Sequence, residues 1–323
     1  MSASEQSLVQ PFDFAADVLH TKQRGLWAQA WQRLLHNRLA VISGIILLAI
    51  LIISVLAEIL PAVQLHDPAV PDFALIEQNP SWEHPFGTDG LGRDLYARMT
   101  QATLFSLKIG IGTQLVILLI GVTIGMSAAL VGRISDMVLM WITDLAFAFP
   151  DLLAIILLRQ VLFGRDWPII GTGDPQIPGF PSSLLVTIMA ISFVGWTTVA
   201  RLVRGQMLSI KEQDYITAAR AIGASPWRIV RVHMLPNTLS AVIVAATFGI
   251  PLAIFAEATL GFIGLGVPPP HASLGSLINS GLDSIQTHNI QLVWPTVMVA
   301  LLMLCFTFLG DGLRDALDPR TRR

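Results

Sequence analysis

Ionisable side chains are rare inside the long apolar runs of this sequence, and those present could carry charge-dependent chemistry. They are Lys108, Asp144, Asp151 and Glu257. A charge at the centre of a membrane helix costs about 2.5–3.5 kcal/mol on insertion scales, so each side chain should face a partner or an aqueous path. Lys108 and Asp151 lie near the ends of their runs and are expected to reach the interface. For Asp144 and Glu257, a place on a polar path and a bond between helices are both open.

Pro150 follows Asp144 within one apolar run. Proline lacks a backbone donor and clashes with the preceding turn, so it should break this helix and free a carbonyl group. A broken helix that carries an acidic side chain is a good candidate to line a path through a membrane. Asp144, Pro150 and Glu257 are therefore the candidate pathway residues.

Catalytic motifs are weak in this chain. Gly171-Thr172-Gly173-Asp174 superficially resembles the Gly-x-Gly-Asp motif of intramembrane aspartyl proteases. Such catalysis needs two carboxylates held together at membrane depth, whereas Asp174 lies in a proline-rich connector. No Gly-x-x-x-x-Gly-Lys-Ser/Thr phosphate loop occurs, so the chain should not hydrolyse ATP itself. The sequence predicts a chain that is not an enzyme and binds no cofactor.

Metal ligands and disulfides are not predicted. Histidines 66, 84, 271 and 288 fall in connecting loops without a recognisable metal-binding spacing. Cys305 is the only cysteine and lies within an apolar run, which excludes an intrachain disulfide and a multi-thiolate site.

A basic segment at 214–237 lies between two apolar runs and is predicted to dock on another protein. Gly223 can end a first short helix, Ser225 is a favourable N-cap, and Pro226 suits the first position of a second helix. Two short helices should therefore meet at a corner. The face of the first helix that should fit a partner's groove consists of Ile216, Ala219, Ile222 and Gly223.

Composition places the chain in a lipid bilayer. Apolar residues make up 53% of the sequence, charged residues only 13%, and the mean hydropathy is +0.65. A membrane crossing needs about 20 apolar residues. The candidate crossings are 39–60, 105–131, 137–158, 183–203, 239–263 and 292–309. Glycines 110, 112, 121 and 125 in the second crossing should permit close helix packing.

The orientation follows from positive charge. Most of the 20 Lys and Arg residues fall in the N-terminal arm, the segment 201–231 and the C-terminal tail. The alternate loops hold only Arg93, Arg98, Arg159 and Arg165. Because cytoplasmic loops carry the positive charge of helical membrane proteins, both termini and the basic segment are predicted to be cytoplasmic.

The predicted organisation is all-α, a polytopic membrane protein with six transmembrane helices. An N-terminal arm at 1–38, without a cleavable signal peptide, precedes the first helix at 39–60. An external loop at 61–104, a five-helix core at 105–309 containing the basic loop 204–237, and a tail at 310–323 follow. Within the arm, an interfacial helix is predicted from an apolar stripe of Trp27, Trp31, Leu34 and Leu35, with a packed or disordered arm as the alternative.

The basic segment resembles the EAA loop of the integral membrane subunits of ATP-binding-cassette (ABC) importers. Its small residues and its Leu-Pro pair match in register, while Thr217 replaces the glutamate of that pattern and His233 its isoleucine. The resemblance implies a coupling helix that rests in a cleft of an ATPase subunit. The coupling residues that it implies are Tyr215, Thr217, Ala218, Ala219, Gly223, Ala224, Ser225, Leu235 and Pro236.

Three further blocks, at 84–94, 257–270 and 310–320, resemble the second membrane subunit of dipeptide and oligopeptide importers. The resemblance implies a permease in the bacterial cytoplasmic membrane that pairs with a second, homologous permease. Its other implied partners are an external substrate-binding protein, membrane lipid, and two cytoplasmic ABC ATPase subunits or domains that bind ATP and Mg. No nucleic acid is expected.

Two alternatives remain open from the sequence. Importers of nickel, glutathione or another small peptide-like solute share this permease architecture. A self-contained secondary transporter would instead hold its ion-coupling groups and broken helices in one chain, often as inverted repeats, and no convincing repeat is present.

Overall fold

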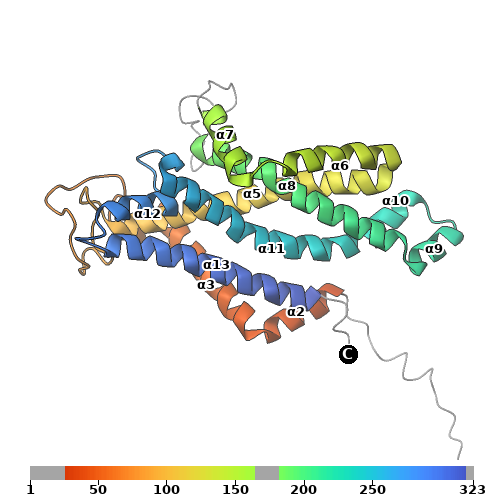
Figure 1. Ribbon diagram of the computed structural model, residues 1–323. Coiled ribbons are helices and arrows are strands. Elements are labelled where there is room, and N and C mark those ends of the chain that lie inside the picture. The colour runs from red at the N-terminus through yellow and green to blue at the C-terminus, as the bar shows by residue number, and fades with distance from the viewer. Residues whose placement is uncertain (1–25, 164–181, 318–323) are drawn as a thin grey trace, which may run out of the picture.

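The computed structural model describes residues 26–163 and 182–317, where the regular elements are all helices (Figure 1). The main helices lie side by side in an elongated bundle. They are α3 (Arg38–Ile59), α5 (Leu95–Val131), α8 (Ser182–Lys211), α11 (Leu235–Leu260) and α13 (Ile290–Leu317). This confirms the all-α prediction. The motif at 171–174 lies outside the described residues.

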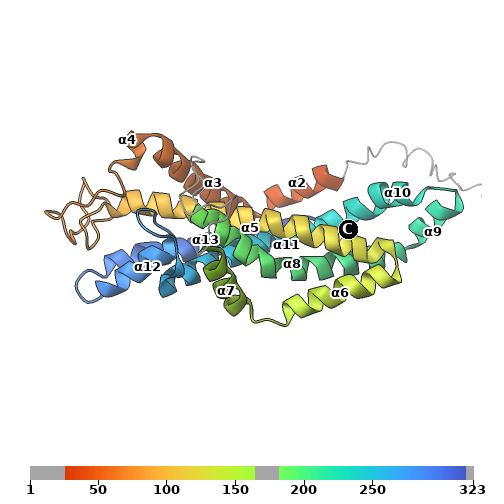
Figure 2. The same ribbon diagram turned by 90° about the horizontal axis from the view of Figure 1, so that it is seen from above.

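Five described helices are long and apolar enough to cross a membrane, and a bent pair would make a sixth crossing. The pair is α6 (Arg133–Phe147) and α7 (Asp151–Phe163), which meet at 88° (Figure 2). Pro150 stands at the bend, so the prediction that it breaks this helix is confirmed. The six predicted crossings hold when the bent pair is counted as one.

Helix α5 begins at Leu95, ahead of the crossing predicted from position 105. Its N-cap is Asp94, whose Oδ1 accepts a hydrogen bond from Ala97 N at 2.7 Å. Gly92 has a φ of +76°, and a Cβ there would meet the backbone of Asp72. The chain around Gly92 therefore stays irregular, and the helix begins three residues later, at Leu95.

Helices α5 and α8 approach closely along a row of glycines. A Cβ at Gly121 would lie 2.7 Å from Val199 Cβ, and one at Gly125 would lie 2.8 Å from Val203 Cβ. The predicted role of these glycines in close helix packing is confirmed. Helix α8 is the central element, because 72% of its most apolar stretch is buried. The corresponding share of α3 is 22%.

The N-terminal helix α2 (Leu26–His36) packs against the C-terminal turns of α13. Ala30 and Leu34 are buried with Ala316, while Trp31 and Leu35 remain 62% and 53% exposed. The predicted stripe is thus divided between the protein's interior and its outer surface. Asn37 caps the following helix α3 by accepting a hydrogen bond from Ala40 N at 3.2 Å.

The two ends of the bundle differ in character (Figures 1 and 2). At one end lie the chain of residues 65–94 and the helix α12 (Leu274–Asp283), which the sequence did not predict. Its start is a capping box of Ser273 and Ser276. At the other end lie α9 (Asp214–Ala221) and α10 (Pro226–Ile229). The short helix α4 (Pro61–Gln64) follows α3, and the π-helical turns η1 (Val230–Met234) and η2 (Gly261–Leu265) flank α11.

Gly125→Ala should destabilise the protein, because the new Cβ would lie 2.5 Å from the carbonyl oxygen of Ala200. Overpacking of this kind lowers the free energy of unfolding by roughly 1–3 kcal/mol. Gly205→Ala in α8 is the matched control, since a Cβ there meets no atom within 4 Å. Thermal unfolding of the detergent-solubilised protein should show a lower midpoint for Gly125→Ala only. Equal midpoints for the two variants would contradict the close contact.

Candidate functional site

The corner between α9 and α10 is built by two capping motifs. Helix α9 ends in a Schellman motif, in which Ala224 N donates to Ala219 O and Gly223 N donates to Arg220 O, both at 3.0 Å. Gly223 has a φ of +84°, a conformation that glycine adopts without strain. The predicted helix end at Gly223 is confirmed.

The predicted start of the second helix is also confirmed, but this helix is not short. Ser225 Oγ accepts a hydrogen bond from Arg228 N at 3.4 Å, and Pro226 follows at the first helical position. Helix α10 then continues through η1 and α11 into η2, a helical stretch of 40 residues from Pro226 to Leu265. The π-helical turn lies where Pro236 removes a helical donor, so the helix continues instead of ending. Leu235 and Pro236 are thus part of this long helix.

One face of α9 packs inside the protein. Ile216 and Ala219 are 0% and 8% exposed and lie in a cluster with Met207, Ile210 and Ile229. Ile216 and Ala219 therefore face the core of this chain, and their fit into a partner's groove stays a prediction. On a short amphipathic helix, apolar residues at helical spacing mark the face turned toward the protein's own core.

The outward face of the corner carries large exposed side chains. Tyr215 is 43%, Ile222 87% and Trp227 70% exposed, and we call these three residues the corner patch. The centre of the Tyr215 ring lies 6.1 Å from that of His233. The predicted coupling residues beside this patch are Thr217, Ala218, Gly223 and Ser225, all exposed, and Ala224, which is half-buried.

Helices α6 and α8 are joined by two ion pairs. Arg201 Nη2 donates to Asp144 Oδ1 at 2.7 Å, and its guanidinium lies 4.1 Å from the centre of the Phe147 ring. Arg204 Nη2 donates to Asp136 Oδ2 at 2.7 Å. The sequence indicated a partner for Asp144 but not which arginine it would be, since the two lie 57 positions apart. Asp144 remains 67% exposed, so it is accessible on the surface of this chain.

Glu257 is buried between helices. It is 2% exposed, and its Oε2 accepts a hydrogen bond from Ser106 Oγ of α5 at 2.7 Å. The positive charge of Arg159, from α7, also acts on this carboxylate. Arg159 in turn donates to the carbonyl oxygen of Gly266. Of the two roles open for Glu257, the bond between helices is the one that these contacts form.

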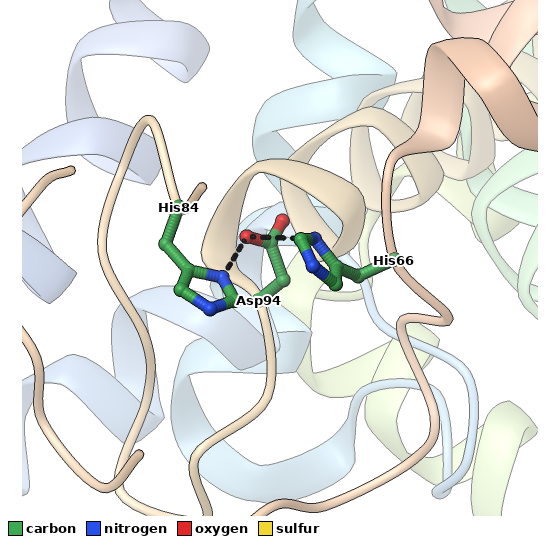
Figure 3. A group of neighbouring side chains, drawn as sticks. All are labelled: His66, His84 and Asp94. Atoms are coloured by element: carbon green, nitrogen blue, oxygen red, sulfur yellow. Dashed lines mark hydrogen bonds and ion pairs between the residues drawn. The ribbon is translucent and has the colours of Figure 1, made fainter. Parts of the chain in front are cut away.

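Lys108 also has a partner, since its Nζ lies 2.9 Å from Glu58 Oε1 of α3. At the end of the bundle opposite the corner patch, His66 and His84 lie beside Asp94, and their ligand atoms are all within 4.8 Å of one another (Figure 3). The sequence missed this group, because its members are separated by loop residues in no regular spacing. The signal that could have found it is the N-cap position of Asp94, which fixes one carboxylate beside a histidine-containing loop.

Two known families match separate parts of the chain. Residues 121–323 match the family described as "Binding-protein-dependent transport system inner membrane component". Residues 25–81 match the "N-terminal TM domain of oligopeptide transport permease C".

Curated relatives match 95% of the chain. The oligopeptide transport system permease protein OppC of Bacillus subtilis (strain 168) is 35% identical over 308 residues, which cover 95% of this chain and 94% of that protein. The dipeptide transport system permease protein DppC of the same strain is 41% identical over 311 residues, covering 95% and 90%. OppC of Escherichia coli (strain K12) is 35% identical over 309 residues, covering 95% of both chains.

A solved structure shares the fold. A chain of the MetNI methionine ABC transporter, in an inward-facing conformation, superposes with a TM-score of 0.51 at 19% identity. The match covers 68% of this chain and 96% of that chain. With the family match over more than half of the sequence, the chain belongs to the inner membrane components of binding-protein-dependent transport systems.

Proposed function

We propose that this chain is a permease subunit of an ATP-driven importer of di- and oligopeptides, and that it forms half of the translocation pathway with a second, homologous permease. The observation that supports this most directly is its similarity, over 95% of its length, to relatives named as oligopeptide and dipeptide permeases. Those names favour peptides over nickel or glutathione as the substrate. An external binding protein would deliver the peptide.

The corner of α9 and α10 is the proposed contact with the ATPase subunits, which bind ATP and Mg. Its exposed apolar side chains have few contacts within this chain, as the 87% exposure of Ile222 illustrates. Large apolar and aromatic side chains of this kind anchor protein interfaces. ATP binding can shift the permease only through a different affinity for its two conformations, and the corner patch would supply that difference.

The bent pair α6 and α7 is the proposed wall of the pathway. Asp144 is exposed on this chain and lies near the break at Pro150. An acidic group at a helix break can interact with the amino group of a peptide, because both the charge and the freed backbone are accessible there. Glu257, by contrast, would act by holding α5 and α11 together.

Replacement of Ile222 by Glu should uncouple the importer. Because this side chain is 87% exposed, the subunit should fold and insert normally, while a buried charge in the interface weakens ATPase binding. Substrate-stimulated ATPase activity and uptake should fall by roughly tenfold or more, which corresponds to about 1.4 kcal/mol. Gly223 itself is unsuitable for this test, since its φ of +84° would strain any side chain.

Trp82→Glu provides the control, because Trp82 is 102% exposed at the other end of the bundle. Recovery of the ATPase subunits in affinity-purified complex should be lost in Ile222→Glu and kept in Trp82→Glu. Wild-type recovery and coupling in Ile222→Glu would refute the proposed contact.

Asp144→Asn and Glu257→Gln should separate transport from stability. The pair of Asp144 with Arg201 is exposed, so its loss should change the free energy of unfolding by only about 0–1 kcal/mol while peptide uptake falls. Glu257→Gln should weaken the buried hydrogen bond from Ser106 and lower stability by roughly 0.5–1.5 kcal/mol. Thermal unfolding measures the stability of each variant, and peptide uptake by the reconstituted complex measures its transport. If uptake is unchanged and the Asp144→Asn complex is unstable, Asp144 stabilises the fold and does not act in the pathway.

The substrate class can be tested in cells. Deletion of the gene for this chain should abolish uptake of labelled di- and oligopeptides and leave nickel uptake unchanged, and a plasmid copy should restore peptide uptake. Loss of nickel uptake with normal peptide uptake would reject the peptide assignment while leaving the coupling mechanism intact.

A further inference from the structure

Two histidines and one aspartate converge at the end of the bundle opposite the corner patch (Figure 3). His84 Nδ1 lies 2.7 Å from Asp94 Oδ2, and His66 Nδ1 lies 3.7 Å from the same oxygen. The two imidazole rings are neighbours, with centroids 4.5 Å apart and planes inclined by 32°. Two ring nitrogens therefore face one carboxylate oxygen, and only His84 is within hydrogen-bonding distance of it.

Helix packing explains the position of His84 and Asp94, but not that of His66. The side chains of His84 and Asp94 are 9% and 1% exposed, and Asp94 is also the N-cap of α5. His66 is 44% exposed, so burial does not hold its ring against the other two. The neighbouring carboxylate of Asp89 is bound by Arg93 and Arg98, which leaves Asp94 as the acid that faces the histidines.

We propose that His66, His84 and Asp94 bind a divalent transition-metal cation, with zinc as the best fit. Imidazole nitrogen and carboxylate oxygen are suitable ligands for zinc. Bonds of about 2.0–2.1 Å at tetrahedral angles separate ligand atoms by about 3.3 Å. This value lies between the two separations from Asp94 Oδ2, 2.7 and 3.7 Å, and all three ligand atoms lie within 4.8 Å of one another, so shifts of the rings would form the site.

The cation would replace the proton that His84 shares with Asp94. It would join the chain that follows α4 to the N-terminus of α5, because His66 lies two residues after the end of α4 and Asp94 directly precedes α5. The three residues leave a fourth coordination position, which a water molecule can occupy. This proposal is independent of the substrate and of the coupling mechanism proposed above.

Zinc binding to the full-length protein in its detergent-purified complex tests the proposal, with a purification tag that contains no histidine. Isothermal titration with Zn²⁺ should show one site per copy of this chain. His66→Ala should weaken binding by roughly tenfold or more, in line with the loss of a ligand. Because the ring of His66 is exposed, this variant should fold normally, which circular dichroism checks.

His36→Ala is the matched control, because His36 is an exposed histidine on α2, away from the site. It should bind zinc as the wild type does. X-ray absorption at the zinc edge should detect two imidazole ligands in the wild type and one in His66→Ala. Equal zinc affinity in the wild type and in His66→Ala, or no zinc bound by either, would overturn the proposal.

Discussion

The close contact of α5 with α8 is the constraint on which the rest of the structure depends. Glycines at 121 and 125 let Val199 and Val203 approach the backbone of α5. Lipid offers little hydrophobic driving force between helices, so such close packing is a main source of their association. Helix α8 continues from this contact toward the corner, where Ile216 packs in the same apolar cluster as Val199 and Val203. A force on α9 therefore acts directly on the central helix.

Local features were predictable from the sequence because their causes lie within a few residues. Pro150 breaks its helix through its own ring and missing donor. Gly223 ends α9 and Ser225 caps α10 through contacts that span at most five positions along the chain. The apolar crossings follow from composition over about 20 residues, which is also a local property.

Features that depend on the tertiary arrangement were not predictable in this way. The helical spacing of Ile216 and Ala219 identifies an apolar face, but not whether that face meets a partner or the protein's own core. The chain brings His66 and His84 to Asp94 through an irregular loop, so no periodic pattern records their proximity. The ion pair of Arg201 with Asp144 also joins two helices that are distant in the sequence, so no local pattern indicates it.

Helix α5 connects the two ends of the molecule. Its 37 residues correspond to a length of about 55 Å, well beyond the roughly 30 Å of a hydrocarbon core. The N-terminal part that extends past the core is buried, with Leu95 and Met99 each 2% exposed in a cluster that includes Leu274 of α12. Asp94 fixes the start of this helix, and Gly125 fixes its packing on α8 near the other end. Because the helix is continuous, a displacement at Asp94 would reach the glycines at which α5 packs on α8.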